Sequence, residues 1–405
     1  MKTEFVKSSR KCISCASNCF VIIYKNQSSL TFENFEPLIF EQQLECCYDC
    51  GLVRQQDNKS YSDKNLSKYY KNTYRTPVNL ETIAVDDSRK KNALKRLKFI
   101  KSLKEKGTLL EIGYGDGVFL DLANNRYDCV GIDPSKGYSI VNEFLESKGV
   151  SIYNCDFKRF RSTVKFEVIC FFLVLEHIKN PLLFLSSTLK FLKPNGVLVI
   201  EVPDIKRYSN FNSETMLTHE HLYHYCINTL SALLGNINLE LIEYSNKKIS
   251  YGFSLLAAFR ISKTKKNIIH SFSGFDSVLL FQDFLALREK YRKNLEYELT
   301  KIQNNISKRT LRLGIYGTGF LYSYAIEKCG LKNIDVEYLF DDTKEKIGTK
   351  LNNKEILPLS MIQEVHVDAL IIFSEMFFGI MKNNVLRLTE NKHIQIINIH
   401  QIAIA

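Results

Sequence analysis

The feature that most constrains the fold of this chain is an acidic, glycine-rich heptad at the end of a short apolar run. The heptad begins at Glu111, ends at Gly117 and reads E-I-G-Y-G-D-G. Its glycines let the backbone turn sharply from a strand into a helix and lie against a ligand with no Cβ in the way. Asp133 follows the next apolar run, Cys129–Ile132, where a carboxylate can hold both hydroxyls of a ribose. The pattern predicts a ligand-binding α/β sheet.

The order E-x-G-x-G-x-G differs from the dinucleotide pattern G-x-G-x-x-G and is similar to the S-adenosylmethionine loop of class I methyltransferases. That resemblance places the glycine backbone at the methionine part of the cofactor, Asp133 at the ribose and Asp156 at the adenine amine. For Asp156, a helix cap is the alternative role. The residues expected at the cofactor are Glu111, Gly113, Gly115, Asp116, Gly117, Asp133, Asp156 and Phe157.

Cysteines are concentrated near the N-terminus, with six of the eleven before residue 51. Cys12 and Cys15 form one C-x-x-C pair, and Cys47 and Cys50 form a second. Two such pairs supply four thiolates and fill a tetrahedral shell, which predicts a structural rather than a catalytic Zn²⁺. Cys46 and Cys19 lie near these pairs, so the choice of the four ligands is less certain from spacing alone. Free buried thiols are the alternative to a zinc site.

With 405 residues, the chain is too long for one ordinary core, and alternating apolar runs and helical stretches predict an α/β protein of several domains. We expect a zinc-binding domain over residues 1–78 and a Rossmann-like class I methyltransferase domain over 79–262. A helical connector over 263–306 then leads to a smaller Rossmann-like domain over 307–405. The tyrosine-rich segment 61–76 fits either a linker or a lid.

Three further groups of residues carry chemistry. His177 follows the fourth expected strand of the central sheet, where α/β sheets bind ligands, and capping a helix is its other role. The run His219-Glu220-His221 suits a metal site, a base with an orienting carboxylate, or a polar patch without function. Gly314–Gly319 with Asp341 resembles a dinucleotide fingerprint, but Tyr322 stands where the third glycine belongs. A nucleotide-sugar or structural role is therefore expected there.

Together these features resemble the three-domain C-methyltransferases that act on nucleotide-linked 4-keto-deoxysugars. The resemblance spans nearly the whole chain and rests on the cysteine pairs, the glycine loop, and the motifs Leu175-Glu176-His177-Ile178, Lys193-Pro194-x-Gly196, His219-Glu220-His221-Leu222 and Tyr316-Gly317-x-Gly319. It implies that His221 removes the proton beside the ketone and that the enolate attacks the sulfonium methyl. Glu220 would position the substrate or the base, and His177 would lie near the sugar.

The same resemblance implies that the C-terminal sheet helps to hold the nucleotide diphosphate, with Lys344 and Lys346 as candidate phosphate contacts. The chain departs from the family pattern at Thr218, where members usually carry tyrosine, and at Tyr251–Ser254, where Gly-Gly-Ser is usual. Transfer to an oxygen or nitrogen of another sugar or small metabolite therefore stays open.

The net charge of +11 is spread along the chain, which suits an anionic small substrate as well as a nucleic acid, or reflects only a lysine-rich composition. We expect a cytoplasmic enzyme that binds neither nucleic acid nor membrane, because no apolar run approaches the roughly 20 residues of a membrane span. Two other classes each fit part of the sequence: a nicotinamide-dependent oxidoreductase that uses the C-terminal glycine turn, and a non-enzymatic zinc module that binds RNA.

Overall fold

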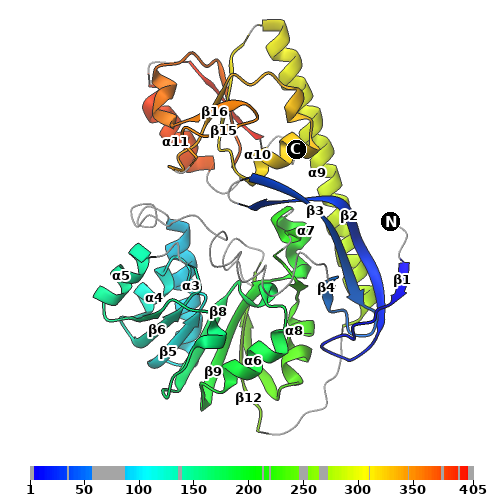
Figure 1. Ribbon diagram of the computed structural model, residues 1–405, viewed down its shortest axis with the longest axis vertical. Helices are drawn as coiled ribbons and strands as arrows, with labels where there is room; N and C mark the ends of the chain where they lie inside the picture. The colour runs from blue at the N-terminus through cyan, green and yellow to red at the C-terminus, as the bar shows by residue number, and fades with distance from the viewer. Residues whose placement is uncertain are drawn as a thin grey trace. The chain divides into compact units, whose positions relative to one another are not determined.

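The structure is a computed structural model that forms two compact units (Figure 1). Unit 1 comprises residues 1–29 and 40–284, and unit 2 comprises residues 30–39 and 285–405. The residues described are 4–33, 36–56, 87–135, 139–211, 214–218, 220–245, 254–263, 272–309, 311–344, 346–374, 378–390 and 393–399. The tyrosine-rich segment, His219 and the departure at Tyr251–Phe253 lie outside them.

A seven-stranded sheet forms the centre of unit 1. Its strands, in spatial order, are β11 (Leu239–Ser245), β12 (Ser254–Ile261), β9 (Leu192–Pro203), β8 (Phe166–Phe172), β5 (Gly107–Ile112), β6 (Tyr127–Ile132) and β7 (Ser151–Tyr153). Strands β9 to β7 run parallel, and β12 runs antiparallel to both of its neighbours. The chain direction across the sheet reverses between β5 and β8, which is the position where open α/β sheets bind ligands.

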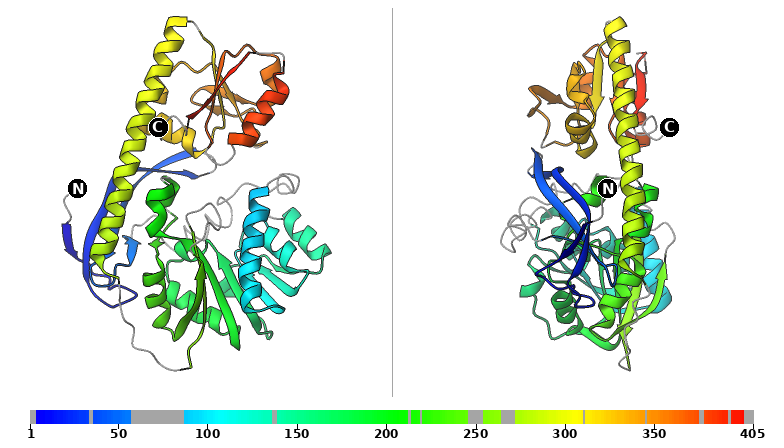
Figure 2. Two further views of the ribbon diagram at one scale, coloured as in Figure 1. Left: turned by 180° about the vertical axis from the view of Figure 1, so that it is seen from behind. Right: turned by 90° about the vertical axis from the view of Figure 1, so that its right-hand side faces the viewer.

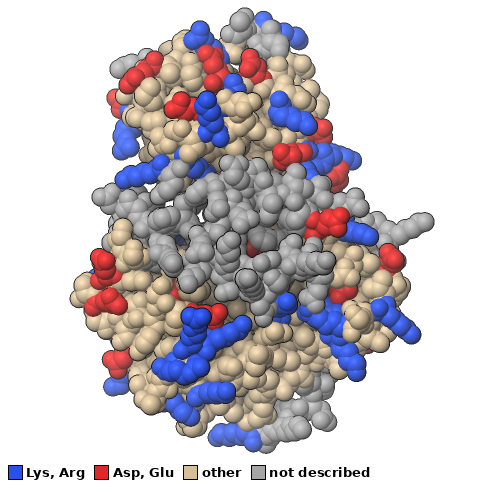
Figure 3. Space-filling view, viewed as in Figure 1, with Lys and Arg blue, Asp and Glu red and all other residues tan. Residues whose placement is uncertain are grey.

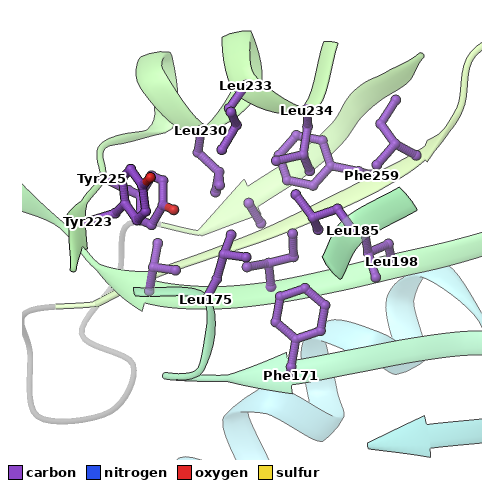
Figure 4. Packing of buried hydrophobic residues seen from close by; sticks show 14 of the residues in the cluster. Phe171, Leu175, Leu185, Leu198, Tyr223, Tyr225, Leu230, Leu233, Leu234 and Phe259 are labelled. Carbon is purple, nitrogen blue, oxygen red and sulfur yellow. The ribbon is translucent and has the colours of Figure 1, made fainter. Parts of the chain in front are cut away.

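Helices cover both faces of this sheet, because neighbouring residues of its buried strands pack in opposite directions. Leu109 packs with α3 (Asp87–Leu103), α4 (Val118–Ala123) and α5 (Ser139–Ser147). Leu110 packs into a second core with α6 (Pro181–Leu189) and α8 (Ile227–Gly235). Figure 4 shows this second core, where leucines of α8 meet Phe259 and Leu198 above the sheet.

The N-terminal part of unit 1 belongs to a second sheet. It contains β1 (Glu4–Lys7), β2 (Cys19–Glu33), β3 (Glu36–Cys47), β4 (Val53–Gln55) and β10 (Tyr223–His224), in that order. The last strand comes from far along the chain, and it pairs antiparallel with β4. Short segments complete the unit: η3 (Phe157–Arg159), η4 (Leu175–His177), η5 (Ile205–Arg207), α7 (Tyr208–Phe211) and η6 (Glu214–Leu217).

Unit 2 is a smaller α/β layer. Its sheet has the order β15 (Lys350–Leu351), β16 (Lys354–Leu357), β14 (Tyr338–Phe340), β13 (Leu313–Tyr316), β17 (Ala369–Ile372) and β18 (Gln395–Asn398), and all strands but β15 run parallel. One core holds residues of α9 (Gly274–Arg309), α10 (Phe320–Lys328) and η7 (Leu331–Asn333). The other holds η8 (Leu359–Gln363) and α11 (Phe378–Leu388). Figure 2 shows the ribbon from two further sides.

The predicted α/β fold class is confirmed, because parallel strands alternate with helices in both units. A long helix, α9, begins at Gly274 and ends at Arg309, in the region where a helical connector over 263–306 is expected. Among the residues that the structure describes, no helix is both long and apolar enough to cross a lipid bilayer.

Candidate functional site

The loop that joins β5 to α4 has the backbone geometry that its glycines predict. Gly113, Gly115 and Gly117 have φ values of +78°, +54° and +73°, in the left-handed region that favours glycine. A Cβ on Gly113 would lie 2.7 Å from a methyl group of Val174, and one on Gly117 would lie 2.8 Å from Leu145. The loop could not accept side chains at these positions without shifting.

Asp133 lies just after β6 and is 8% exposed. Its carboxylate accepts hydrogen bonds from the backbone amides of Ser135, at 2.8 Å, and Gly115, at 3.2 Å. The aspartate therefore joins the tip of one strand to the glycine loop of its neighbour. Asp156 caps η3, where its side chain accepts a hydrogen bond from the amide of Lys158 at 2.9 Å. It thus takes the capping role that the sequence left as an alternative.

A cavity of about 860 Å³ lies beside this loop. All the residues predicted at the cofactor line it except Gly117, which packs against α5 instead. Part of its wall is aromatic, with Phe157 in edge contact with Phe184 at 5.3 Å between ring centroids. The volume falls in the range of about 300–1,000 Å³ that small-molecule sites occupy.

Cations surround much of the cavity. Those that line it are Arg89, Arg96, Lys158, Arg161, Lys179 and Lys190. Figure 3 shows lysine and arginine side chains gathered low on one face of unit 1, over the region where Figure 1 labels β6 to β9. The predicted cofactor residues Glu111, Asp116 and Asp133 line the same cavity at the glycine loop, where Arg89 pairs with Asp116 at 3.0 Å and Arg96 lies near Glu111. We call the other four cations, Lys158, Arg161, Lys179 and Lys190, the basic side of the cavity.

Two histidines lie together near this cavity, and we call them the imidazole pair. The rings of His177, which lines the cavity, and His221 have centroids 5.1 Å apart. Nδ1 of His177 lies 3.0 Å from the carbonyl oxygen of Glu220, and Nδ1 of His221 lies 3.1 Å from that of Met216. A carbonyl oxygen only accepts, so each Nδ1 donates, and each neutral ring keeps its lone pair on Nε2.

A buried carboxylate completes this group. Glu176 is 1% exposed, and one of its oxygens lies 3.8 Å from Nε2 of His177. Ligand atoms of Glu176 and the imidazole pair all lie within 4.8 Å of one another. Such an arrangement stabilises a positive charge on the imidazoles, carried by a proton or by a divalent cation. The predicted partner Glu220 contributes its backbone carbonyl to this group.

The four cysteines of the two C-x-x-C pairs come together in unit 1. The sulfurs of Cys12 and Cys50 lie 3.6 Å apart, those of Cys15 and Cys47 lie 3.4 Å apart, and all four lie within 4.8 Å of one another. Four sulfurs at tetrahedral positions around zinc stand about 3.8 Å apart, given Zn–S bonds near 2.3 Å. Contacts among the four thiols lower the pKa values of Cys15 and Cys47 and raise those of Cys12 and Cys50. The cluster is compatible with zinc.

In unit 2 an aspartate lies beside the glycine turn, as Asp133 lies beside the glycine loop of unit 1. Asp341 follows β14, and its carboxylate accepts from the amide of Thr318 at 2.8 Å and from its hydroxyl at 2.6 Å. Lys346 lies 3.4 Å from the same oxygen. Burial opposes ionisation of Asp341, but Lys346 and Thr318 outweigh it and lower the pKa of the carboxyl group. Tyr322 is buried against Phe373.

Comparison with known families matches two regions of the chain. Residues 86–244 match a family model described as a methyltransferase domain, and residues 309–395 match one described as C2185-like, N-terminal. The first match covers the glycine loop and the strands of the central sheet from β5 to β11, and it ends before β12. Residues 86–244 form a class I, S-adenosylmethionine-dependent methyltransferase domain.

Solved structures similar to this chain include several methyltransferases. One from Clostridium acetobutylicum is 13% identical, with a TM-score of 0.35, and the match covers 45% of this chain and 94% of that one. CcbJ from Streptomyces caelestis is also 13% identical, at a TM-score of 0.35, with 42% and 90% covered. The plantazolicin methyltransferase BpumL, solved with S-adenosylhomocysteine and a monoazolic desmethylPZN analog, is 17% identical at a TM-score of 0.37, with 44% and 87% covered. These resemblances do not indicate a substrate. No curated protein matches the chain.

The methyltransferase domain buries one acidic residue beside its glycine loop. Glu111 is 2% exposed, and burial raises its pKa well above the usual value, while the nearby Arg96 acts in the opposite direction. Arg96 donates to Glu201 at 2.6 Å and stacks 4.5 Å from the centroid of Phe172. The ammonium and sulfonium charges of the cofactor would favour the ionised form of Glu111.

Two side chains were not predicted from the sequence: the buried carboxylate of Glu176 and the partly exposed guanidinium of Arg96. Glu176 stands in the motif with His177, but neighbours in a chain usually point apart, and only the tight turn of η4 brings them together. Arg96 lies in a basic stretch with several lysines and arginines, where no local signal distinguishes it. Its ion pair with Glu201 spans 105 positions in sequence.

Proposed function

We propose that this chain transfers a methyl group from S-adenosylmethionine to a carbon next to the keto group of a nucleotide-linked deoxysugar. The observation that carries the proposal is the imidazole pair: both rings keep a lone pair on Nε2, they lie close to a buried carboxylate, and His177 lines a cofactor-sized cavity. Methylation at carbon requires a base, because a C–H bond has no lone pair to attack the methyl group. Transfer to an oxygen or nitrogen is the alternative.

The base in this proposal is His221. Its Nδ1 is fixed by Met216, so Nε2 takes the proton from the carbon beside the ketone. The electron pair of that C–H bond forms the new bond to the methyl carbon, and the methyl–sulfur bond breaks to leave S-adenosylhomocysteine. Glu176 and His177 lie close enough to stabilise the resulting imidazolium. A positioned base contributes about 10²–10⁴-fold to such a step.

The cavity fits the cofactor that supplies this methyl group. The left-handed glycine backbone gives close approach to its methionine part, and Asp133 lies where both ribose hydroxyls can be bound. Phe157 offers an aromatic surface to the adenine, and Asp156, although it caps η3, still lines the same cavity. Bound S-adenosylmethionine supplies an electrophilic methyl group at its sulfonium.

The basic side of the cavity supports an anionic acceptor. Lys158, Arg161 and Lys190 line it and can bind the phosphates of a nucleotide. The candidate phosphate contact Lys346 is already close to Asp341 and to the carbonyl oxygen of Thr318, at 3.2 Å. The carboxylate of Asp341 already has partners within unit 2, which favours a structural role for this glycine turn. The turn therefore gives no support to a nicotinamide cofactor.

The proposed role of zinc is structural. Cys12, Cys15, Cys47 and Cys50 fill four tetrahedral positions and leave no site for water or substrate. The ion would hold together the N-terminal loop and the turn before β4.

The test combines exchange and transfer with a panel of nucleotide-linked keto sugars. In deuterated water, the parent enzyme should exchange the acceptor C–H and should add one methyl group at that carbon, as followed by mass spectrometry. His221→Ala should lose both activities by at least about 100-fold, while its affinity for S-adenosylmethionine stays the same. His366→Ala, a surface substitution in unit 2, is the control. A product methylated at oxygen or nitrogen without C–H exchange would contradict the proposal.

A further inference from the structure

We infer that the cysteine cluster positions the imidazole pair, through the strand pair β4–β10, and that Arg54 and Tyr223 are the positioning residues. The inference rests on the proposed zinc site but is independent of the acceptor. We call the imidazole pair with Glu176 the acceptor half of the proposed site, and the glycine loop with Asp133 the cofactor half. In this inference the N-terminal sheet positions the acceptor half and does not affect the cofactor half.

The backbone provides the first link. Strand β4 begins three residues after Cys50, and β10 begins two residues after His221. In this antiparallel pair, Arg54 stands opposite Tyr223, and the amide of Gln55 donates to the carbonyl oxygen of Leu222 at 2.9 Å. Any displacement of β4 is therefore passed to the residues next to His221.

Leu222 fixes the histidine loop from both sides. Its carbonyl oxygen is held by β4, and its amide donates to the carbonyl oxygen of Glu176 at 2.8 Å. His177, the next residue after Glu176, in turn donates from Nδ1 to the carbonyl oxygen of Glu220. The two imidazoles therefore lie on segments that are hydrogen-bonded to each other, and one of these segments is an edge of the cysteine-bearing sheet.

Arg54 provides the second link, through its side chain. The residue is 2% exposed, and its guanidinium donates to Glu45 at 2.7 Å and to the carbonyl oxygens of Arg10 and Lys11 at 2.7 and 2.9 Å. These two carbonyls immediately precede Cys12. A metal that joins Cys12 to the cysteines before β4 would thus hold the segment with these two carbonyl oxygens close to the strand that carries Arg54.

Tyr223 provides the third link, and it reaches the cavity wall. Its hydroxyl accepts from Arg10 at 2.6 Å and donates to the carbonyl oxygen of Lys179 at 3.4 Å. Lys179 lines the cavity two residues after His177. The cofactor loop around Gly115 is bonded instead to β6 and Asp133, and none of the hydrogen bonds described above involves it. Coupling should therefore reach the imidazoles and spare the cofactor.

Hydrogen exchange of the full chain, in zinc-loaded and chelator-treated form, tests the coupling. Removal of zinc should accelerate exchange over residues 220–226 by about tenfold or more, which corresponds to the loss of one hydrogen bond of about 1.4 kcal/mol. Exchange over 107–135 and the dissociation constant for S-adenosylmethionine should stay unchanged. In parallel, the rate at which diethyl pyrocarbonate modifies His221 should change, with His366 as the internal reference.

Tyrosine substitutions separate positioning from folding. Tyr223→Phe removes only the hydroxyl, and it should alter exchange and His221 reactivity while one zinc per chain is retained. Tyr225→Phe is the matched control: its buried ring stacks on Tyr223, but its hydroxyl has no hydrogen-bond partner in the part of the chain that the structure describes. It should behave as the parent.

Three results would overturn the inference. The first is unchanged exchange of the histidine loop after zinc removal, and the second is equal acceleration of the cofactor loop, which would mean general unfolding of unit 1. The third is identical behaviour of the two tyrosine variants. A chain that binds no zinc would refute the cysteine site, and the coupling with it. Failure of methyl transfer to keto sugars would leave these measurements intact, so the two proposals fail separately.

Discussion

Asp133 offers the sharpest test of the cofactor site. In the proposed cofactor site its carboxylate would accept two ribose hydroxyls, and hydrogen bonds to charged groups contribute about 1.5–3 kcal/mol each. Allowing for water that replaces part of this interaction, Asp133→Ala should cost about 3 kcal/mol of binding free energy, a roughly 140-fold rise in the dissociation constant. At a cofactor concentration 100 times the parent dissociation constant, stabilisation should fall from about 2.7 to about 0.3 kcal/mol.

A thermal shift assay measures this difference. For a unit of this size, the parent should gain about 5–10 °C with S-adenosylmethionine and the variant about 1 °C. Asp133 also holds the amides of Gly115 and Ser135, so Asp133→Asn, which keeps one acceptor oxygen, separates loop support from ribose binding. Asp341→Ala is the matched control, because it removes an equivalent loop aspartate from unit 2. An equal shift in Asp133→Ala and the parent would refute the assignment.

Three other predictions concern the cysteine cluster, His224 and the imidazole pair. Cys47→Ala should abolish binding of one zinc per chain, as followed by mass spectrometry, and should unfold the N-terminal sheet. Cys46→Ala, one residue away but outside the cluster, should still bind zinc. Burial holds the pKa of His224 well below 6.5, so the stability that its neutral form contributes is complete above pH 6.5 and falls as the pH drops, by up to about 1.4 kcal/mol per unit. His224→Asn should flatten this slope in urea unfolding followed by circular dichroism. Zinc added beyond one equivalent should bind weakly at the imidazole pair, and calorimetry should show that Glu176→Gln abolishes this second event.

Much of the cofactor half was predictable because its determinants are local. The glycines of the loop, the strand before it and the aspartate after β6 are set by backbone sterics within a few residues. The two C-x-x-C pairs were also predictable, since each pair needs only a tight turn. The structure brings all four sulfurs together and leaves Cys46 and Cys19 outside the cluster.

The surroundings of the imidazole pair depend on contacts between residues far apart in the chain, which the sequence pattern does not predict. Strand β10 has only two residues, too few for any periodicity, and its partner β4 lies about 170 positions earlier. Asp156 is another example, because a carboxylate at a strand end can cap a helix and line a cavity at once, and spacing does not separate the two roles. The roles of His221, Glu220 and His177 in catalysis stay predictions until they are measured.

The two glycine turns share a sequence pattern but differ in the groups that contact the aspartate beside each turn. Asp133 and Asp341 each follow the second strand of a parallel sheet, and each accepts an amide from the glycine loop beside it. Asp341 also takes the hydroxyl of Thr318 and lies beside the ammonium group of Lys346. A ribose would have to displace both groups to reach that carboxylate, at the cost of a buried ion pair. In unit 1 the equivalent loop position is Gly115, which has no side chain to compete. The same backbone pattern therefore favours a ligand in one unit and a self-contained turn in the other.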